Sequence, residues 1–155
     1  MISNSTPLIF LSKINKLNFL KELFKIVIIP KDVEKEVLKA NKPDSISIKK
    51  AIKEGWIRVK DPGDNKDLQL GDGENAAINL ARENKNSLII DDALGIKVAD
   101  GFNIKTLRTT TIIFLAVNKK IIDKEQAISL INKLIENSYY ISNEYYAKIL
   151  TKLKD

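Results

Sequence analysis

The sequence contains no histidine and no cysteine among its 155 residues. These two absences exclude imidazole acid–base catalysis, Ser-His-Asp and Cys-His nucleophiles, zinc clusters built on those ligands, and disulfide bonds. The oxygen atoms of the remaining carboxylate side chains are the ligands that Mg²⁺ and Mn²⁺ prefer. Any chemistry at a site in this chain is therefore expected to be carboxylate chemistry.

Long apolar runs are absent as well. No stretch approaches the roughly 18 residues of a membrane span, and Met1 leads into a candidate strand without a basic and apolar leader. We therefore expect a cytoplasmic protein with no membrane partner. A chain of 155 residues is long enough for one buried core, so we predict a single domain over residues 1–155.

The charge balance is basic but not extreme. Lys and Arg number 26 against 20 Asp and Glu, which gives a formal net charge of +6. Such an excess permits a polyanionic partner without requiring one, because a solvated lysine-rich surface has the same composition. The location of the acidic residues must decide between a polyanionic partner and a solvated surface.

Short apolar runs alternate with helical patterns along the chain, which is typical of successive βα units. We predict an α/β fold with three α/β/α layers and a short-stranded, mainly parallel central sheet. Strands are predicted over residues 2–3, 26–29, 56–59, 88–90 and 104–107. Helices are predicted to begin near Pro7, Lys31, Ser45, Gly73, Asp92 and Thr109, with two more over 124–137 and 142–154. The turn-forming stretch 61–66 is predicted to be an exposed loop.

Polar residues lie at or near the places where strands end. Ligands in open parallel sheets bind outside the carboxyl ends of the strands, and four groups of residues qualify there: Ser3 with Asn4, Glu36, Glu74, and Asp91 with Asp92. Glu36 is predicted to lean inward, since it lies beside the apolar stripe of the helix predicted over 31–40. Glu74 opens the stripe of the helix predicted over 73–83, at three, four and seven residues before apolar positions.

Three of these acids, taken singly, have a simpler structural explanation. Glu74 would stabilise the helix dipole with Asp72 as the N-cap, Asp91 would cap the next helix, and Asp92 would be an exposed residue of its first turn. The combination favours a site, because several acids at one sheet edge raise one another's pKa values unless a cation neutralises them.

Five segments, in order along nearly the whole chain, resemble elements of the PIN-domain family. They are the opening strand and turn at 2–9, a strand-Pro-x-x-Val-x-x-Glu-Val element at 28–37, a Leu-Gly-x-Gly-Glu-x-x-Ala-Ile helix start at 70–78, an Asp-Asp strand exit at 88–99, and the ending at 140–146. The ending is similar to that of a prokaryotic, largely archaeal, PIN-like subfamily. No single motif is specific to this family, but the five motifs together, in this order along the chain, are.

The resemblance implies a ribonuclease dependent on Mg²⁺ or Mn²⁺, similar to VapC-like toxins, which acts as a homodimer and is restrained by a small antitoxin protein. It implies catalytic and metal-ligand roles for Glu36, Glu74, Asp91 and Asp92, and a metal-ligand role for Asn4. Three hydroxyl residues would have accessory roles near the site: Ser3, Thr109 and Thr110. The implied reaction is metal-assisted hydrolysis of RNA phosphodiester bonds.

Asn4 occupies the position where most members of that family have aspartate. An amide oxygen can coordinate a hard cation but brings no charge, so Asn4 should weaken metal affinity and could prevent a second ion from binding. One alternative is therefore a PIN-like RNA- or protein-binding scaffold with little catalysis. A receiver-like signalling domain is less favoured, because those domains place their acid pair after the first strand.

Basic residues near these segments are candidates for contacts with a phosphate backbone, although each is more often a plain surface residue. They are Lys13, Lys16, Arg82, Lys97 and Arg108. Phe10 and Trp56 could stack on bases, but both lie in apolar patterns that predict a place in the core.

Overall fold

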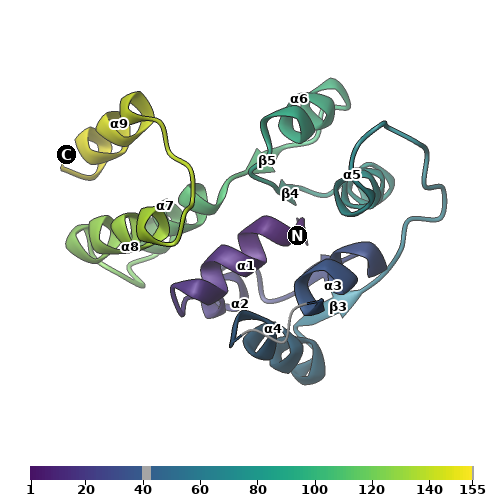
Figure 1. The fold of residues 1–155 in the computed structure, drawn as a ribbon, viewed down its shortest axis with the longest axis horizontal. Helices are drawn as coiled ribbons and strands as arrows, with labels where there is room; N and C mark the ends of the chain where they lie inside the picture. Colours follow the sequence, from purple (N-terminus) through teal and green to yellow (C-terminus); the bar gives the residue numbers. More distant parts are fainter. Residues whose placement is uncertain (40–42, 155) are drawn as a thin grey trace.

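A computed structural model describes residues 1–39 and 43–154. Within these ranges, five strands form one sheet in the order β3-β2-β1-β4-β5, and every neighbouring pair is parallel (Figure 1). The strands are β1 (Ile2–Ser3), β2 (Val27–Ile29), β3 (Ile57–Val59), β4 (Leu88–Ile89) and β5 (Thr106–Leu107). The predicted α/β fold is confirmed, and its sheet is parallel throughout.

Nine helices form within the described part of the chain. They are α1 (Ser5–Lys13), α2 (Asn18–Phe24), α3 (Lys31–Leu38), α4 (Pro43–Glu54), α5 (Asp72–Asn84), α6 (Ala93–Gly101), α7 (Thr109–Asn118), α8 (Lys124–Glu136) and α9 (Asn143–Lys154). Helix α2 was not predicted, because it is only seven residues long and its N-cap, Leu17, offers no capping side chain. Ala40, the predicted end of α3, lies outside the described residues.

The central strands β1 and β4 bury side chains on both faces, which explains why they read as continuous apolar runs, whereas Arg58 in the edge strand β3 is exposed. Ile89 packs into the larger core cluster with α1, α2, α4 and α7, whereas its neighbours Leu88 and Ile90 pack into the smaller cluster with α5 and α6. This alternation follows from the two-residue period of a strand. It gives the three layers that the sequence predicts.

The order in which the strands follow one another reverses between β1 and β4. The Asn4 N–H donates to the Ile89 carbonyl at 2.9 Å, so the carboxyl ends of these two strands meet side by side. A crevice at such a reversal is the usual ligand site of open α/β sheets. Asn4 follows β1 directly, and Asp91 and Asp92 follow β4 after one intervening residue, Ile90.

Helix α3 completes this edge of the sheet. It contacts α1, α4 and α5, and Figure 1 shows it between α4 and α5. A residue of another segment holds the start of α3, because the Asp61 carboxylate accepts the Lys31 N–H at 2.9 Å. The predicted loop at 61–66 is exposed apart from a half-buried Pro62, in agreement with the prediction.

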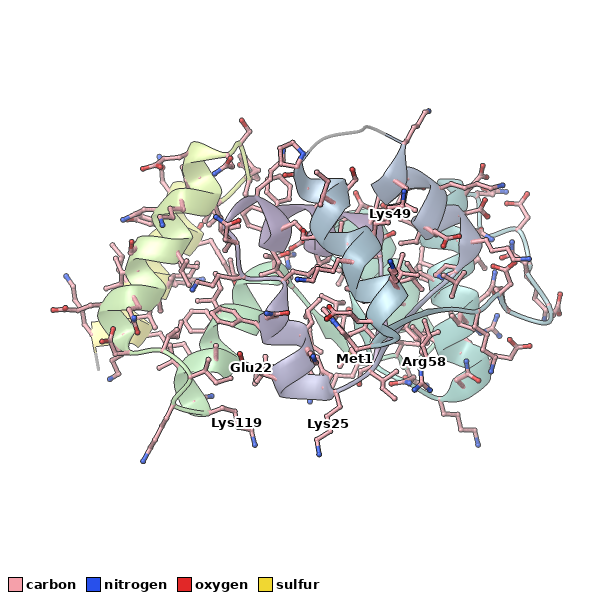
Figure 2. The ribbon with its side chains drawn as sticks, turned by 90° about the horizontal axis from the view of Figure 1, so that it is seen from below. Met1, Glu22, Lys25, Lys49, Arg58 and Lys119 are labelled. Atoms are coloured by element: carbon pink, nitrogen blue, oxygen red, sulfur yellow. The ribbon has the colours of Figure 1, made fainter. Side chains whose placement is uncertain are left out.

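Helices α8 and α9 pack against each other beside α7, on the side of the molecule away from α5 and α6 (Figure 1). No helix in the described ranges is both long and apolar enough to span a bilayer. In Figure 2, Lys25 and Lys119 project along the lower edge, with Met1 close by. Met1 and Lys25 precede β1 and β2, so this lower edge, where Glu22 also lies, is at the amino ends of the strands, opposite Asp91 and Asp92.

Candidate metal site at the carboxyl ends of the strands

Glu74 shows most clearly that acidic residues converge at this edge. Burial raises the pKa of its carboxyl above the ordinary value of 4.5, and the negative charges of Asp92 and Glu36 raise it further. Its side chain is half-buried and has no hydrogen-bond or ion-pair partner among the described residues. Two carboxylates, Glu36 from α3 and Asp92 from the β4 exit, therefore repel the carboxylate of Glu74 from α5.

Glu36 reaches the edge from α3. The Ser5 hydroxyl, at the start of α1, donates to Glu36 Oε2 at 2.5 Å. A methyl group added at Gly73 would clash with Glu36 Oε1 and lie 2.9 Å from its Cδ, so the glycine leaves the space in which this carboxylate sits. Glu36 is exposed overall, which corrects the prediction that it leans inward.

Asp92 is the N-cap of α6. Its Oδ2 accepts the Gly95 N–H at 2.8 Å, while its Oδ1 has no hydrogen-bond partner within the described ranges. The capping role predicted for Asp91 therefore belongs to Asp92. The capping role predicted for Asp72 belongs to Gly71, and Asp72 is the first residue of α5.

Asp91 has different surroundings from Asp92. Its Oδ1 accepts the Thr109 N–H at 3.0 Å and the Tyr139 hydroxyl, and its Oδ2 accepts the Thr109 hydroxyl at 2.7 Å. Burial and the charge of Asp91 raise the pKa of Tyr139, so the phenol keeps its proton and remains a donor. The Asp91 carboxylate is thus occupied by donors from α7 and from the segment before α9.

Asn4 is 3% exposed, and its Oδ1 is buried without a hydrogen-bond partner among the described residues. A buried amide oxygen left unpaired costs free energy, of the order of 1 to 3 kcal/mol. Ser3 does not relieve it, since the Ser3 hydroxyl donates to the Asn4 main-chain carbonyl at 2.9 Å. The other predicted accessory residue, Thr110, is buried and pairs with the Tyr145 hydroxyl at 3.1 Å.

These groups fit a hard divalent cation by their chemistry. The donors are the oxygens of Glu36, Glu74 and Asp92 together with an orphaned amide oxygen of Asn4, and a cation would offset both the mutual repulsion and the missing partner. Over residues 1–39 and 43–154, no three acidic side chains already have the spacing of a metal chelate. Glu36 and Asp92 lie close enough to Glu74 to raise its pKa, but the three carboxylates do not have the spacing of a metal chelate.

The predicted basic residues are spread over the molecule. Lys13 lies at the far end of α1 over the Phe10 ring, Lys16 lies over the Phe19 ring, and Arg82 lies over the Phe102 ring near the end of α5. Lys97 is exposed within α6. Arg108 alone among the five follows a strand directly, as the N-cap of α7.

The two aromatic residues singled out above differ in burial. Trp56 is 6% exposed, as predicted for a core residue. Phe10 is partly buried against the core and meets the Tyr139 ring edge-on at a centroid distance of 5.1 Å. Neither ring lies open at the acidic edge of the sheet.

Three residues of the site were missed in the sequence: Ser5, Gly73 and Tyr139. Ser5 and Gly73 lie inside the motifs at 2–9 and 70–78, so the motifs themselves were a signal for these two residues. Tyr139 lies 48 residues after Asp91, and no local pattern connects the two.

Comparison with known proteins gives one match. A family model described as a PIN domain matches residues 1–155, the full length of the sequence. No curated protein and no solved structure matches the chain significantly. The parallel sheet and the position of the acids at its carboxyl edge agree with that match, and the chain belongs to the PIN-domain family.

Proposed function

We propose that this protein is a metal-dependent ribonuclease that uses Mg²⁺ or Mn²⁺ to hydrolyse RNA phosphodiester bonds. Membership of the PIN-domain family suggests a nuclease-type function and a nucleic-acid substrate. The observation that carries the finer proposal is the convergence of Glu36, Glu74 and Asp92, which raises the pKa of Glu74. An unneutralised cluster of this kind is costly unless it has a use.

Glu36, Glu74 and Asp92 would hold the ion, with the Asn4 Oδ1 as a neutral fourth donor. The bound ion would supply a Lewis acid that activates water and stabilises negative charge on the leaving oxygen. Ser5 keeps Glu36 at the edge through its hydrogen bond, and the Gly95 N–H fixes Asp92 through Oδ2 while leaving Oδ1 free among the described residues. The chain thus orients two of the carboxylates by one hydrogen bond each.

Arg108 is the basic residue best placed to hold the phosphate backbone beside this site. The register pairs Ile89 with Leu107, which puts Arg108 next to the β4 exit, and its side chain is exposed. Arg108→Gln should weaken binding of a labelled RNA and reduce the salt dependence of binding, because one phosphate contact is lost. Arg82→Gln, at the opposite end of the strands, is the matched control and should bind as wild type.

The function is tested with purified protein, a labelled RNA of mixed sequence and Mn²⁺. Cleavage should require Mn²⁺, stop on addition of EDTA, and fall at least a hundredfold in Asp92→Asn. Asp100→Asn, an exposed acid on the same helix, should cleave as wild type. Cleavage that survives EDTA or the Asp92→Asn substitution would contradict the proposal.

A second function, an RNA- or protein-binding scaffold with little catalysis, is favoured by one observation. Asn4 supplies no charge where most members of the family have aspartate. Asn4→Asp distinguishes the two functions: RNA binding should change little under both, whereas cleavage should rise greatly only if the natural protein is a scaffold. A wild-type protein that already cleaves at the rate of the Asn4→Asp variant would exclude the scaffold.

The family resemblance also supports a homodimer that acts as the toxin of a toxin–antitoxin pair. Light scattering during size-exclusion chromatography tests the dimer directly. Induced expression tests the toxin role: the wild type should arrest growth, and Asp92→Asn should not. A monomer at micromolar concentration, or equal growth with both proteins, would remove the corresponding part of the proposal.

A further inference from the structure

The Asp91 carboxylate is the most heavily hydrogen-bonded acid at this edge of the sheet. Three donors share it: the Thr109 N–H at 3.0 Å, the Thr109 hydroxyl at 2.7 Å, and the Tyr139 hydroxyl. Both of its oxygens are engaged by the protein itself. Glu74, in contrast, has no partner within the described ranges, and Asp92 uses one oxygen.

The donors come from distant parts of the chain. Thr109 is the first residue of α7 and is fully buried, and Tyr139 is 8% exposed in the connection between α8 and α9. The Tyr139 ring also meets Phe10 of α1 edge-on at 5.1 Å. Asp91 therefore ties the β4 exit to α7 and to the chain between the two C-terminal helices.

The strand alternation explains why Asp91 serves this purpose and Asp92 does not. Ile89 packs into the core cluster that contains α7, and Ile90 packs into the cluster that contains α5 and α6. Continued alternation directs Asp91 to the side of α7 and Asp92 to the side of α5 and α6. Any movement of the β4 exit would displace both side chains together, since they are adjacent in the chain.

We infer that Asp91 is a positioning residue rather than a metal ligand, and that its hydrogen bonds to Tyr139 and Thr109 hold Asp92 toward Glu36 and Glu74. The inference rests on the metal site of the proposed function. The segment between α8 and α9 thereby contributes to metal affinity without touching the ion. Hydrogen-bond partners behind a metal site typically change metal affinity or activity by about 10- to 100-fold when they are removed.

Titration calorimetry of Mn²⁺ binding to the full chain tests the inference without any RNA. Tyr139→Phe removes only the hydroxyl and keeps the ring against Phe10, and it should raise the dissociation constant for Mn²⁺ about tenfold. Tyr145→Phe is the matched control, because it removes a hydroxyl that pairs with Thr110, one residue beyond Thr109. It should bind Mn²⁺ as wild type.

Thr109 supplies an independent pair of variants. Thr109→Val removes the hydroxyl bond to Asp91 and should weaken Mn²⁺ binding, whereas Thr109→Ser retains a hydroxyl and should restore it. A purely structural role would lower the unfolding temperature in Tyr139→Phe and Tyr145→Phe without separating their Mn²⁺ affinities. The affinity difference is therefore the readout that identifies positioning.

An unchanged or higher Mn²⁺ affinity in Tyr139→Phe would show that Asp91 is itself a ligand. Removing the Tyr139 hydroxyl would then free an Asp91 lone pair, so Tyr139→Phe would bind Mn²⁺ as tightly as wild type or more tightly, and Asp91→Asn would lose as much affinity as Asp92→Asn. That result would overturn the inference and leave the proposed function intact. A wild-type protein that binds no Mn²⁺ would overturn both.

Discussion

Two neighbouring aspartates, Asp91 and Asp92, have nearly opposite surroundings. Asp91 accepts three hydrogen bonds from Thr109 and Tyr139, and its charge is used within the fold. Asp92 accepts one hydrogen bond from Gly95 and repels Glu74. The donors around Asp91 come from the fold itself, whereas the charge of Asp92 opposes ionisation of Glu74. Identical residue types at one strand exit thus have different roles: Asp91 holds parts of the fold together, and cation binding is the role proposed for Asp92.

The largest effect is expected from a substitution of Asp91 that removes its hydrogen bonds. Asp91→Asn replaces a carboxylate oxygen with an amide group that cannot accept from its donors, so the metal-free protein should lose about 3 kcal/mol of unfolding free energy. For a chain of this size, that corresponds to a fall of about 6 to 12 °C in the unfolding temperature. Calorimetry measures it in the presence of EDTA.

Asp92→Asn is the control for that measurement. Asparagine caps a helix as well as aspartate does, and the substitution removes repulsion with Glu74, so the metal-free unfolding temperature should stay level or rise slightly. Equal losses in the two variants would show that the two aspartates do not differ in the way described.

Gly73→Ala is expected to have a smaller effect, on the affinity of the proposed site of Glu36, Glu74 and Asp92 for Mn²⁺. The added methyl group would displace the Glu36 carboxylate, so the affinity for Mn²⁺ should fall about tenfold, or about 1.4 kcal/mol. Stability without metal should change little, because the atoms in the way belong to the end of a flexible side chain. Gly71→Ala, where an added methyl group meets nothing within 4 Å, is the control. Equal affinities in the two variants would show that the position of Glu36 does not matter.

The smallest effect is a stabilisation by Glu74→Gln in the metal-free protein. Because the pKa of Glu74 is raised in the folded state, its charged form destabilises the fold, fully above the folded pKa and not at all below the unfolded value near 4.5. Glu74→Gln should therefore gain up to about 1 kcal/mol at pH 7, a figure kept low because the side chain is only half-buried. Urea midpoints at pH 7 and pH 4 measure the difference, which should shrink on acidification. A variant less stable than wild type at pH 7 would contradict the repulsion.

The fold followed from the sequence, and so did the meeting of Glu36, Glu74 and Asp92 at one edge of the sheet. Strand positions were recoverable because the strands are short apolar runs, buried on both faces in the central β1 and β4, and the acids were recoverable because carboxyl ends of parallel strands meet at one edge. The sequence could not separate Asp91 from Asp92, because that difference depends on which core cluster Ile89 and Ile90 enter. The Tyr139 contact was out of reach, since it joins segments 48 residues apart. Helix α2 escaped notice because it is short and uncapped.

Thermal unfolding across a Mn²⁺ titration, with wild type beside Asp92→Asn, tests the central claim most directly and needs no knowledge of the RNA. Wild type should be stabilised saturably, by about 2.7 kcal/mol at 100 times the dissociation constant, and Asp92→Asn should show little or no response. A flat wild-type titration, or an equal response in both proteins, would contradict a metal site built on these carboxylates.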